Sequence, residues 1–466
     1  MTKPSLLGPT FLLGLFLAVC VLMPLWHPLN IEFSEFNIKR IAEILLLAGS
    51  GLLLIASSRL RLGWLERFLQ LPELARLGIV AFFALGVVST LQAALPKYAF
   101  LEIGLMALLF FFTLSIAAEV TLQEKVSDRI VWLIFSAIGL YCIAFYANLF
   151  FPFGNNTLSP GFSNLRFLAQ FQAWTLPLVT LPLYLKPELR GWRRSLILSV
   201  AALWWGITFF NSAKGLAVAL LVSTVFIGLL MRERSTRSWF LLQLKLLAAG
   251  FALYLILTAV TSLEGYLTGI EGSVGSRLTL WQQSLEFIRQ HPLLGIGPLH
   301  LANHYNAHAA HPHNSLLQLA AEWGVPATII VLGLFIWGYG SWLKGCVGRQ
   351  TPMDIALSLS LSTGAVYSLA SGILVMPLSQ VAMALVFGLA LGRHHAQAMI
   401  RREIAPKTQW LLSAALVLIL IRFTLVLFPE VLHLPRDEFF WIATHSQDGH
   451  AHLQPRFWQQ GWFQRL

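Results

Sequence analysis

The sequence is poor in charged residues and in cysteine. Only 11% of its 466 residues are charged, whereas 57% are hydrophobic and the mean hydropathy is +0.70. Soluble domains carry about 25% charged residues, so this composition excludes a soluble globular protein. The three cysteines, Cys20, Cys142 and Cys346, lie far apart in apolar sequence without Cys-x-x-Cys spacing. Their positions imply no disulfide framework and no cysteine metal site, and predict small buried thiols.

Acidic residues are scarcer than basic ones. The 21 Asp and Glu residues stand against 32 Lys and Arg residues, which gives a net charge of +11. In a soluble chain this excess would suggest nucleic-acid binding. Here the basic residues form short clusters between apolar runs, and the clusters favour alternate loops, as the positive-inside rule predicts for membrane proteins. We therefore expect no nucleic-acid partner and assign the basic loops to the cytoplasmic side.

Apolar runs long enough to cross a bilayer, about 17 to 23 residues each, occur thirteen times. They lie near residues 6–26, 41–58, 77–95, 99–118, 130–150, 167–185, 195–210, 214–231, 240–261, 326–343, 353–375, 377–392 and 410–428. The first run is too long for a signal-peptide core and has no small-residue cleavage site after it, so we expect it to remain as a span. Because 195–210 is short and 377–392 almost continues the run before it, twelve spans also fit. We predict an all-α polytopic membrane protein with 12 or 13 transmembrane helices.

This topology divides the chain into four parts. Residues 1–261 are predicted to form about nine transmembrane helices, and residues 326–428 about four more. Between them, residues 262–325 form one long loop with amphipathic helices, and residues 429–466 form a short tail. The long loop, the smaller loop at 151–165 and the tail all face away from the cytoplasm, so we expect the chemistry there.

Four cations break the positive-inside pattern, because they lie at or near the outer edge of the predicted spans. They are Arg166, Lys214, Arg277 and Arg289. A cation at membrane depth costs roughly a few kcal/mol and is usually kept for a partner. The partner we predict is an anion.

The long loop is predicted to contain two short helices. Residues 276–290 place four apolar side chains on one face, which we expect to pack against the membrane domain. These are Leu278, Trp281, Leu285 and Ile288. Gly295 and Gly297 predict a turn rather than a phosphate-binding loop. Asn314 is predicted to cap a second helix, 315–323.

The second helix carries Asn314, Gln318 and Glu322 at helical spacing on one side. These polar side chains either form a solvated face or bind hydroxyl groups of a ligand. Both interpretations fit the spacing equally well.

Several histidines precede this helix, and three interpretations of them compete. The rings of His300, His304 and His308 can simply form hydrogen bonds in a polar loop. Alternatively, His304 and His308, with His311 and His313 close by, can bind a metal ion, although no carboxylate accompanies them. In the third interpretation His313, fixed at a helix start, accepts a proton beside a bound anion, a role that suits a side chain with a pKa near 6.5.

Four segments of the sequence together resemble a known family. GSRLTLWQQSLEFIRQHPLLGIGPLHL (275–301) and HPHNSLLQLAAEWGVPA (311–327) resemble the periplasmic-loop signature of the O-antigen ligase and polymerase superfamily, which includes bacterial protein O-oligosaccharyltransferases. GFSNLRFLAQFQAWTLPL (161–178) resembles the family's loop-to-helix segment, and NSAKGLAVAL (211–220) resembles a segment that usually reads Ser-Arg-Gly. Lys214 occupies the position of that arginine, so a point charge replaces a planar fork there.

The resemblance implies an inverting membrane glycosyltransferase with a GT-C-like fold. Such an enzyme takes a finished glycan from undecaprenyl diphosphate and moves it to an acceptor hydroxyl on the periplasmic face of the bacterial inner membrane. The diphosphate would be held by Arg166, Lys214, Arg277 and Arg289. His313 and Arg277 would be catalytic, because His313 would orient or deprotonate the acceptor and Arg277 would stabilise the leaving group. Acceptor or sugar hydroxyls would be bound by His311, Asn314, Gln318 and Glu322. The last three would alternatively orient His313.

The expected partners are the lipid-linked glycan, its acceptor and membrane lipid, with no metal, nucleotide or other cofactor. The resemblance leaves three acceptors open: lipid A-core sugar, a serine or threonine of a protein such as pilin, or the growing glycan. We favour lipid A-core, the broadest reading of the signature. The tail is shorter than the C-terminal domain of many general protein transferases, although a pilin-specific enzyme could lack that domain. A transporter of anions or lipid-linked glycans is the alternative from another class, but no repeated halves or paired broken helices are visible.

Overall fold

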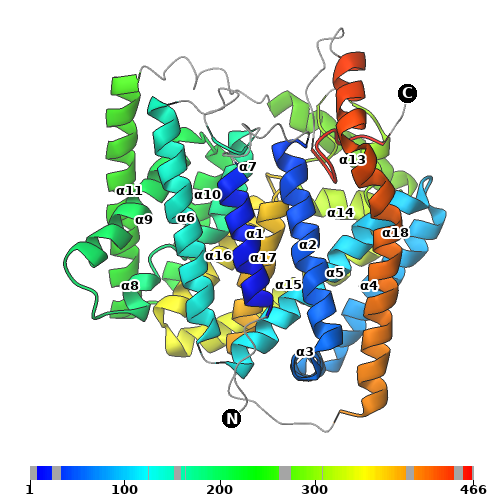
Figure 1. The fold of residues 1–466 in the computed structure, drawn as a ribbon, viewed down its shortest axis with the longest axis horizontal. Helices are drawn as coiled ribbons and strands as arrows, with labels where there is room; N and C mark the ends of the chain where they lie inside the picture. Colours follow the sequence, from blue (N-terminus) through cyan, green and yellow to red (C-terminus); the bar gives the residue numbers. More distant parts are fainter. Residues whose placement is uncertain are drawn as a thin grey trace.

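The computed structural model of the chain describes residues 8–23, 33–123, 125–151, 159–162, 164–261, 274–306, 308–394, 404–445 and 455–463. Every regular element in these ranges is helical. Figure 1 shows most of the helices running side by side along one direction. Residues 262–273 of the predicted long loop lie outside the described residues.

Eleven of the described helices precede the predicted loop. They are α1 (Pro9–Leu22), α2 (Glu35–Ala56), α3 (Ser58–Gln70), α4 (Glu73–Gln92), α5 (Pro96–Leu122), α6 (Val126–Phe150), α7 (Leu165–Thr175), α8 (Pro182–Leu185), α9 (Trp192–Phe210), α10 (Lys214–Leu230) and α11 (Arg234–Thr261). The loop and the segment after it supply α13 (Val274–Gln290), the 3-10 helix η3 (His300–Asn303), α14 (Ser315–Trp323), α15 (Val325–Arg349), α16 (Pro352–Tyr367), α17 (Pro377–His394) and α18 (Pro406–His445).

Six of the described helices are long and apolar enough to cross a membrane, namely α4, α5, α6, α11, α15 and α18. A seventh span results if α2 and α3, which meet at a bend of 103°, are taken together. Helices α1 and α10 are apolar but shorter. The predicted all-α, multi-pass class is confirmed, whereas the number of spans that pass on length and apolarity is lower than the predicted twelve or thirteen.

The run at 167–185 shows why the number differs. The segment is not one helix, since α7 ends at Thr175 and turns lead to the four-residue α8. Pro177 and Pro182 have no amide hydrogen to continue a helix. The irregular backbone is tolerated because residues 168–183 are buried among other helices rather than exposed to lipid.

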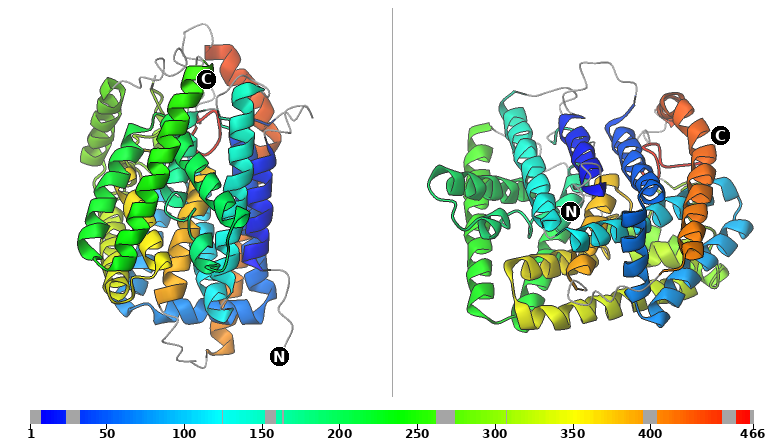
Figure 2. Two further views of the ribbon diagram at one scale, coloured as in Figure 1. Left: turned by 90° about the vertical axis from the view of Figure 1, so that its left-hand side faces the viewer. Right: turned by 60° about the horizontal axis from the view of Figure 1, so that its bottom comes forward.

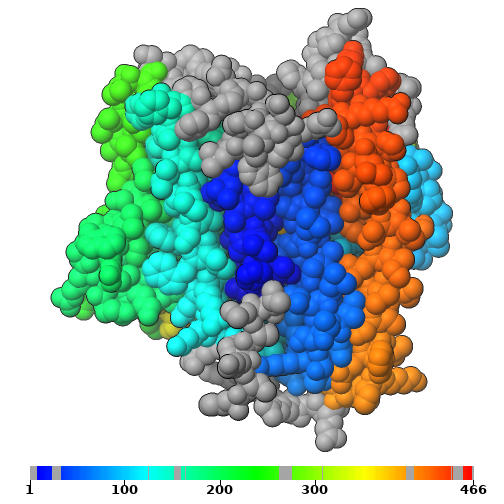
Figure 3. Space-filling model, viewed as in Figure 1, coloured from blue at the N-terminus to red at the C-terminus, as the bar shows by residue number. Residues whose placement is uncertain are grey.

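Small residues let the central helices approach closely. Helix α17 packs along α5, and a Cβ atom added at Gly388 would lie only 2.8 Å from the Thr113 carbonyl oxygen. One added at Gly392 would lie 3.0 Å from the carbonyl oxygen of Ala117. Packing through small residues is typical of membrane helix bundles. On the outside of the bundle, α1 lies between α2 and α6 (Figure 3).

Helix α18 extends along almost the whole height of the bundle (Figures 1 and 2). Its 40 residues span about 60 Å at 1.5 Å per residue, roughly twice the hydrocarbon thickness of a bilayer. The helix continues through Pro429 and Pro435, so the boundary predicted at residue 428 falls inside it. Beyond it, residues 455–463 fold back against the protein and most of them are buried.

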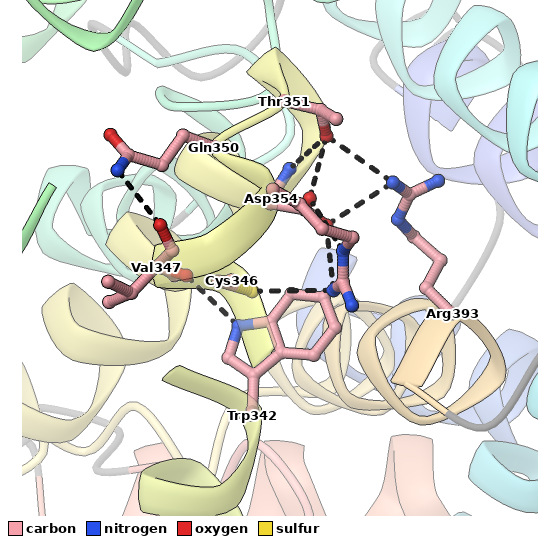
Figure 4. A network of polar contacts seen from close by, with 9 residues as sticks. Trp342, Cys346, Val347, Gln350, Thr351, Asp354 and Arg393 are labelled. Carbon is pink, nitrogen blue, oxygen red and sulfur yellow. Dashed lines mark hydrogen bonds and ion pairs between the residues drawn. The ribbon is translucent and has the colours of Figure 1, made fainter. Parts of the chain in front are cut away.

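A buried carboxylate joins three helices at the turn between α15 and α16 (Figure 4). Asp354 accepts hydrogen bonds from Arg349 Nε at 3.1 Å and Arg349 Nη2 at 3.3 Å, from Arg393 Nη2 at 3.2 Å and from Thr351 Oγ1 at 2.8 Å. Arg393 belongs to α17. We call Arg349, Thr351, Asp354 and Arg393 the clamp. It joins the C-terminal end of α15, the start of α16 and the C-terminal end of α17, one full length of α15 away from the predicted loop.

Loss of this clamp should destabilise the fold. Asp354→Ala leaves Arg349 and Arg393 without their shared carboxylate, so we expect the free energy of unfolding to fall by about 1–3 kcal/mol. The measurement is thermal unfolding of the purified protein. Glu188→Ala is the matched control, because its pair with Lys186 is long at 3.8 Å and exposed, and should leave the midpoint unchanged. Equal midpoints for both variants would contradict a structural role for the clamp.

Candidate functional site

His313 lies immediately before α14 in a left-handed backbone conformation, with φ at +53°. The next residue fixes it there. Asn314 Oδ1 accepts hydrogen bonds from the amides of Leu316 at 3.1 Å and Leu317 at 3.0 Å, and its Nδ2 donates to the Leu369 carbonyl at 3.1 Å. The predicted cap is confirmed, and Asn314 is thereby engaged in holding the start of α14.

Two arginines from distant segments act on the His313 ring. Burial lowers the pKa of the His313 imidazole to about 4, and the positive charges of Arg277 and Arg166 add to the fall. Arg277 lies in the first turns of α13, and Arg166 in the first turn of α7, 111 residues earlier in the chain. His313 is therefore neutral at physiological pH and faces two cations.

Arg166 and Arg277 also interact electrostatically with each other and with Tyr367, the last residue of α16. Like charges held together in a partly buried place are costly unless an anion can join them. We call Arg166, Arg277 and His313 the cation site. Sequence reasoning identified these three residues. It did not identify Tyr367, because this residue lies within an apolar run that is predicted as a membrane span.

The two other predicted cations occupy different places. Lys214 is exposed in the first turn of α10, and its neighbour Gly215 packs against Tyr367, where an added Cβ would lie 3.0 Å from the ring. Lys214 therefore adjoins the cation site. Arg289 instead forms an ion pair with Glu286 at 2.8 Å, and its side chain is 78% exposed.

The predicted diphosphate role of Arg289 is thus not supported by its position. Arg277 and Arg289 lie twelve residues apart on one helix, which separates them by about 18 Å along its axis. A diphosphate bound by Arg277 at the start of α13 therefore lies too far from Arg289 to contact it.

Helix α13 is present as predicted, but the predicted packing face is wrong. Leu278 and Leu285 are 55% and 54% exposed, whereas Leu280 and Ser284 are buried. The Trp281 indole donates a hydrogen bond to the Pro312 carbonyl at 2.9 Å, directly before His313. In a membrane protein apolar side chains can face lipid, so hydrophobicity did not distinguish the two faces.

The Gly295 and Gly297 turn is confirmed, with φ at +65° and +111°. The amide of Ile296 donates to the Ala321 carbonyl at 2.9 Å, and the amide of Gly297 to the Glu322 carbonyl at 3.0 Å. These amides therefore stabilise the end of α14, and this turn positions the helix rather than a phosphate.

The predicted polar face of α14 is not a solvated surface. Glu322 is 1% exposed, its Oε2 lies 2.5 Å from Arg456 Nη2, and its Oε1 accepts a hydrogen bond from the Leu301 amide at 3.1 Å. Burial raises the pKa of the Glu322 carboxyl to about 7, and the Arg456 charge opposes that rise. Gln318, with its amide oxygen turned toward Arg456, accepts from Nη1 at 3.0 Å and Nη2 at 2.8 Å. Gln318 and Glu322 therefore bind Arg456 inside the protein, and they do not form an open face for a sugar.

His311 packs beside His313, with 4.3 Å between the ring centroids. The ring is 4% exposed and fills the space above Gly372, where no side chain would fit. Burial lowers the pKa of His311 well below its ordinary value, and the charges of His313 and Arg456 add to this. The position of His311 suits support of the His313 ring better than contact with a sugar.

The remaining histidines of the loop have other surroundings. His300 Nε2 accepts a hydrogen bond from the Leu95 amide at 2.9 Å, and the His304 ring packs on Phe287 at 4.6 Å between centroids. His308 is exposed. Within the described ranges no three His, Cys, Asp or Glu side chains are grouped so that they could hold a metal ion. The arrangement of the rings thus gives no support to the metal interpretation.

Arg456 is the main residue of this region that sequence reasoning missed. Arg456 lies among aromatic and glutamine residues in the segment 455–463, and nothing in that local sequence indicates which helix it contacts. Its partners Glu102 and Glu322 come from α5 and α14.

Part of the chain matches a known protein family. Residues 194–332 match the family model described as O-Antigen ligase. The matched range contains Arg277, His313 and Glu322, whereas Arg166 and Arg456 lie outside it. No curated protein matches the chain.

Proposed function

Because the chain belongs to the O-antigen ligase superfamily, we propose that it transfers a glycan from undecaprenyl diphosphate to an acceptor hydroxyl, with lipid A-core as the acceptor. The observation that carries this proposal is the cation site, in which a neutral histidine lies beside two arginines. The same proposal places the protein in the bacterial inner membrane with this site facing the periplasm.

The two arginines suit the leaving group. As the bond between the anomeric carbon and the diphosphate oxygen breaks, negative charge grows on that oxygen. Arg166 and Arg277 supply fixed positive charge for it through charge-assisted hydrogen bonds. We propose Lys214, at the edge of the site, as a third contact for the diphosphate. Since the guanidinium groups provide this charge themselves, the proposed reaction needs no metal ion or nucleotide.

His313 suits the other half of the reaction. It takes the proton of the acceptor hydroxyl while the acceptor oxygen forms its new bond to the anomeric carbon, and undecaprenyl diphosphate departs from the opposite face of the sugar. The anomeric centre is therefore inverted. Binding of the anionic diphosphate offsets the charges of Arg277 and Arg166, which raises the pKa of His313 and makes it a better base once the donor is bound.

Three other functions remain as outcomes of the experiment. A protein O-oligosaccharyltransferase would use the same donor chemistry with a serine or threonine acceptor. A polymerase would extend the glycan on its own carrier. A transporter would move an anion or a lipid-linked glycan without breaking the glycosidic bond.

Purified protein in vesicles separates these functions. We expect it to transfer glycan from undecaprenyl diphosphate to lipid A-core, with an inverted anomeric linkage in the product and no loss of rate with a chelator. Parallel reactions offer a serine-containing pilin peptide, or donor alone. Glycopeptide as the sole product would indicate the protein transferase, and lengthened lipid-linked glycan the polymerase. Movement of labelled donor across the bilayer without any transfer would contradict a glycosyltransferase.

A further inference from the structure

We call residues 455–463 the strap. The strap packs against α2, α5 and the loop that precedes His313. The Gln459 amide donates a hydrogen bond to Asn37 Oδ1 at 2.9 Å, and the Phe463 amide donates to the Ala302 carbonyl at 3.1 Å. The Phe463 ring stacks on Tyr98 at 4.0 Å between centroids, with 4° between the ring planes. The strap thus contacts both the helix bundle and the candidate site.

Arg456 of the strap is the cation that links these parts. Its side chain is 2% exposed and lies 2.5 Å from Glu322 and 3.5 Å from Glu102. The amide oxygen of Gln318 completes its contacts on α14. A guanidinium buried this deeply is stable only because its fork meets several acceptors at once.

A second buried arginine holds the strap backbone in place. Arg40 of α2 donates from Nε to the Phe457 carbonyl at 3.0 Å and from Nη2 to the Arg456 carbonyl at 3.3 Å, while its Nη1 pairs with Glu43 at 2.5 Å. In this cluster three carboxylates, those of Glu43, Glu102 and Glu322, face two guanidinium groups. Loss of Arg456 would therefore leave Glu322 without its paired cation, and Glu102 with the charge of Arg40 alone.

The contacts continue from Arg456 to the proposed base. Gln318 and Glu322 lie on two successive turns of α14, the short helix that begins next to His313. Glu322 also holds the Leu301 amide of the preceding loop. On the other side, the charge of Arg456 and the carbonyl of Pro455 act on His311, which packs against His313. The strap thus supports His313 through its helix and through its neighbouring ring.

We propose that Arg456 is a positioning residue for glycan transfer, which sets the place of His313 by tying α14 and His311 to the strap. This inference rests on the proposed function. Arg456 touches neither the cation site nor any reacting atom. The donor is bound by other residues, so Arg456 should affect the rate of the chemical step and leave donor binding unchanged.

The test compares kcat and KM of purified variants in vesicles with undecaprenyl-diphosphate glycan and lipid A-core. A misplacement of about 1 Å can cost roughly 100-fold in rate, so we expect Arg456→Gln to lower kcat by about 10- to 100-fold with the donor KM unchanged. Arg456→Lys keeps the charge but loses the fork, and it should restore part of the rate. Arg422, exposed on α18 over the Phe100 ring, provides the matched control, and Arg422→Gln should transfer glycan normally.

The pH profile separates positioning from simple loss of folded protein. Glu102 and Arg456 are the charged groups that face Glu322. We expect kcat/KM of the unmodified protein to fall as the pH drops through about 7, because protonation of Glu322 weakens its pair with Arg456. Arg456→Gln has no such pair to weaken, so this acidic limb should be absent from that variant. It should be absent from Arg456→Gln/Glu322→Gln as well.

Normal kcat in Arg456→Gln would overturn the inference, as would a fall in rate that matches the fall in folded protein at every pH. If Arg456→Gln does not insert, Arg456→Lys decides the question, because normal kcat in that folded variant would equally overturn the inference. If the unmodified protein transfers no glycan to any acceptor, the proposed function itself has failed. If it transfers glycan and the Arg456 variants do so at the same rate, only the positioning role has failed.

Discussion

Arg277→Ala should abolish glycan transfer while the protein remains folded and inserted. The guanidinium of Arg277 is one of two charges that act on His313, and in the proposed reaction it stabilises the departing diphosphate. Arg277→Lys should recover only part of the rate, since a point charge cannot make the two parallel hydrogen bonds of a planar fork. The measurement is complementation of a strain without the gene, followed by kinetics of the purified variants.

Arg289 offers a control on the same helix. It carries the same charge as Arg277 but is exposed and paired with Glu286, so Arg289→Ala should leave transfer close to normal. Near-normal transfer by Arg277→Ala would contradict the leaving-group role. Equal losses in both variants would indicate that α13 needs positive charge in general rather than a guanidinium at one place.

His313→Ala should lower kcat by about 10²- to 10⁴-fold, the range typical of general acid-base groups. The substitution keeps a residue with a Cβ atom in a left-handed conformation, whose backbone cost of about 1–2 kcal/mol His313 already bears. His313→Gly and His313→Asn tolerate that conformation, so they test the chemistry without the strain. If either variant transfers glycan at the normal rate, His313 is not the base.

The neighbouring histidines and the pH profile complete this test. His304→Ala and His308→Ala should be mild, because one ring packs on Phe287 and the other is exposed. In a Glu322→Gln background, kcat/KM should fall only as the pH drops toward about 4, where protonation removes the His313 base. Rate loss upon chelation, restored by zinc, or equal damage at all three histidines would support the metal site instead.

Composition and local rules predicted the features that depend on neighbours in sequence. The membrane class follows from summed apolar content, the cap at Asn314 from the residues that follow it, and the turn at Gly295 and Gly297 from the freedom of glycine. Each can be inferred from composition or from the sequence within a few residues. The sequence also pointed to Arg277 and His313, because they stand in unusual surroundings of an apolar chain.

Features that depend on distant segments were not predictable in this way. The pair of Arg456 with Glu322 joins residues 134 positions apart, and Arg166 reaches the site from α7. Apolar periodicity also failed on α13, because it cannot tell a protein-facing from a lipid-facing side. The run at 167–185 has the composition of a membrane span, because burial inside the protein requires the same apolar residues as exposure to lipid.

The position of the strap in the chain also means that Arg456 is synthesised after the carboxylates with which it pairs. At about 5–20 residues per second, Arg456 is added to the nascent chain roughly 7 to 27 s after Glu322, which lies 134 residues earlier. During that interval Glu102 and Glu322 have no counter-ion from the strap, so α14 cannot yet close over them as ion-paired carboxylates. A nascent chain that has already inserted its helices therefore still lacks the Arg456 contacts beside the candidate site. We expect these contacts to form late, after the strap has been synthesised.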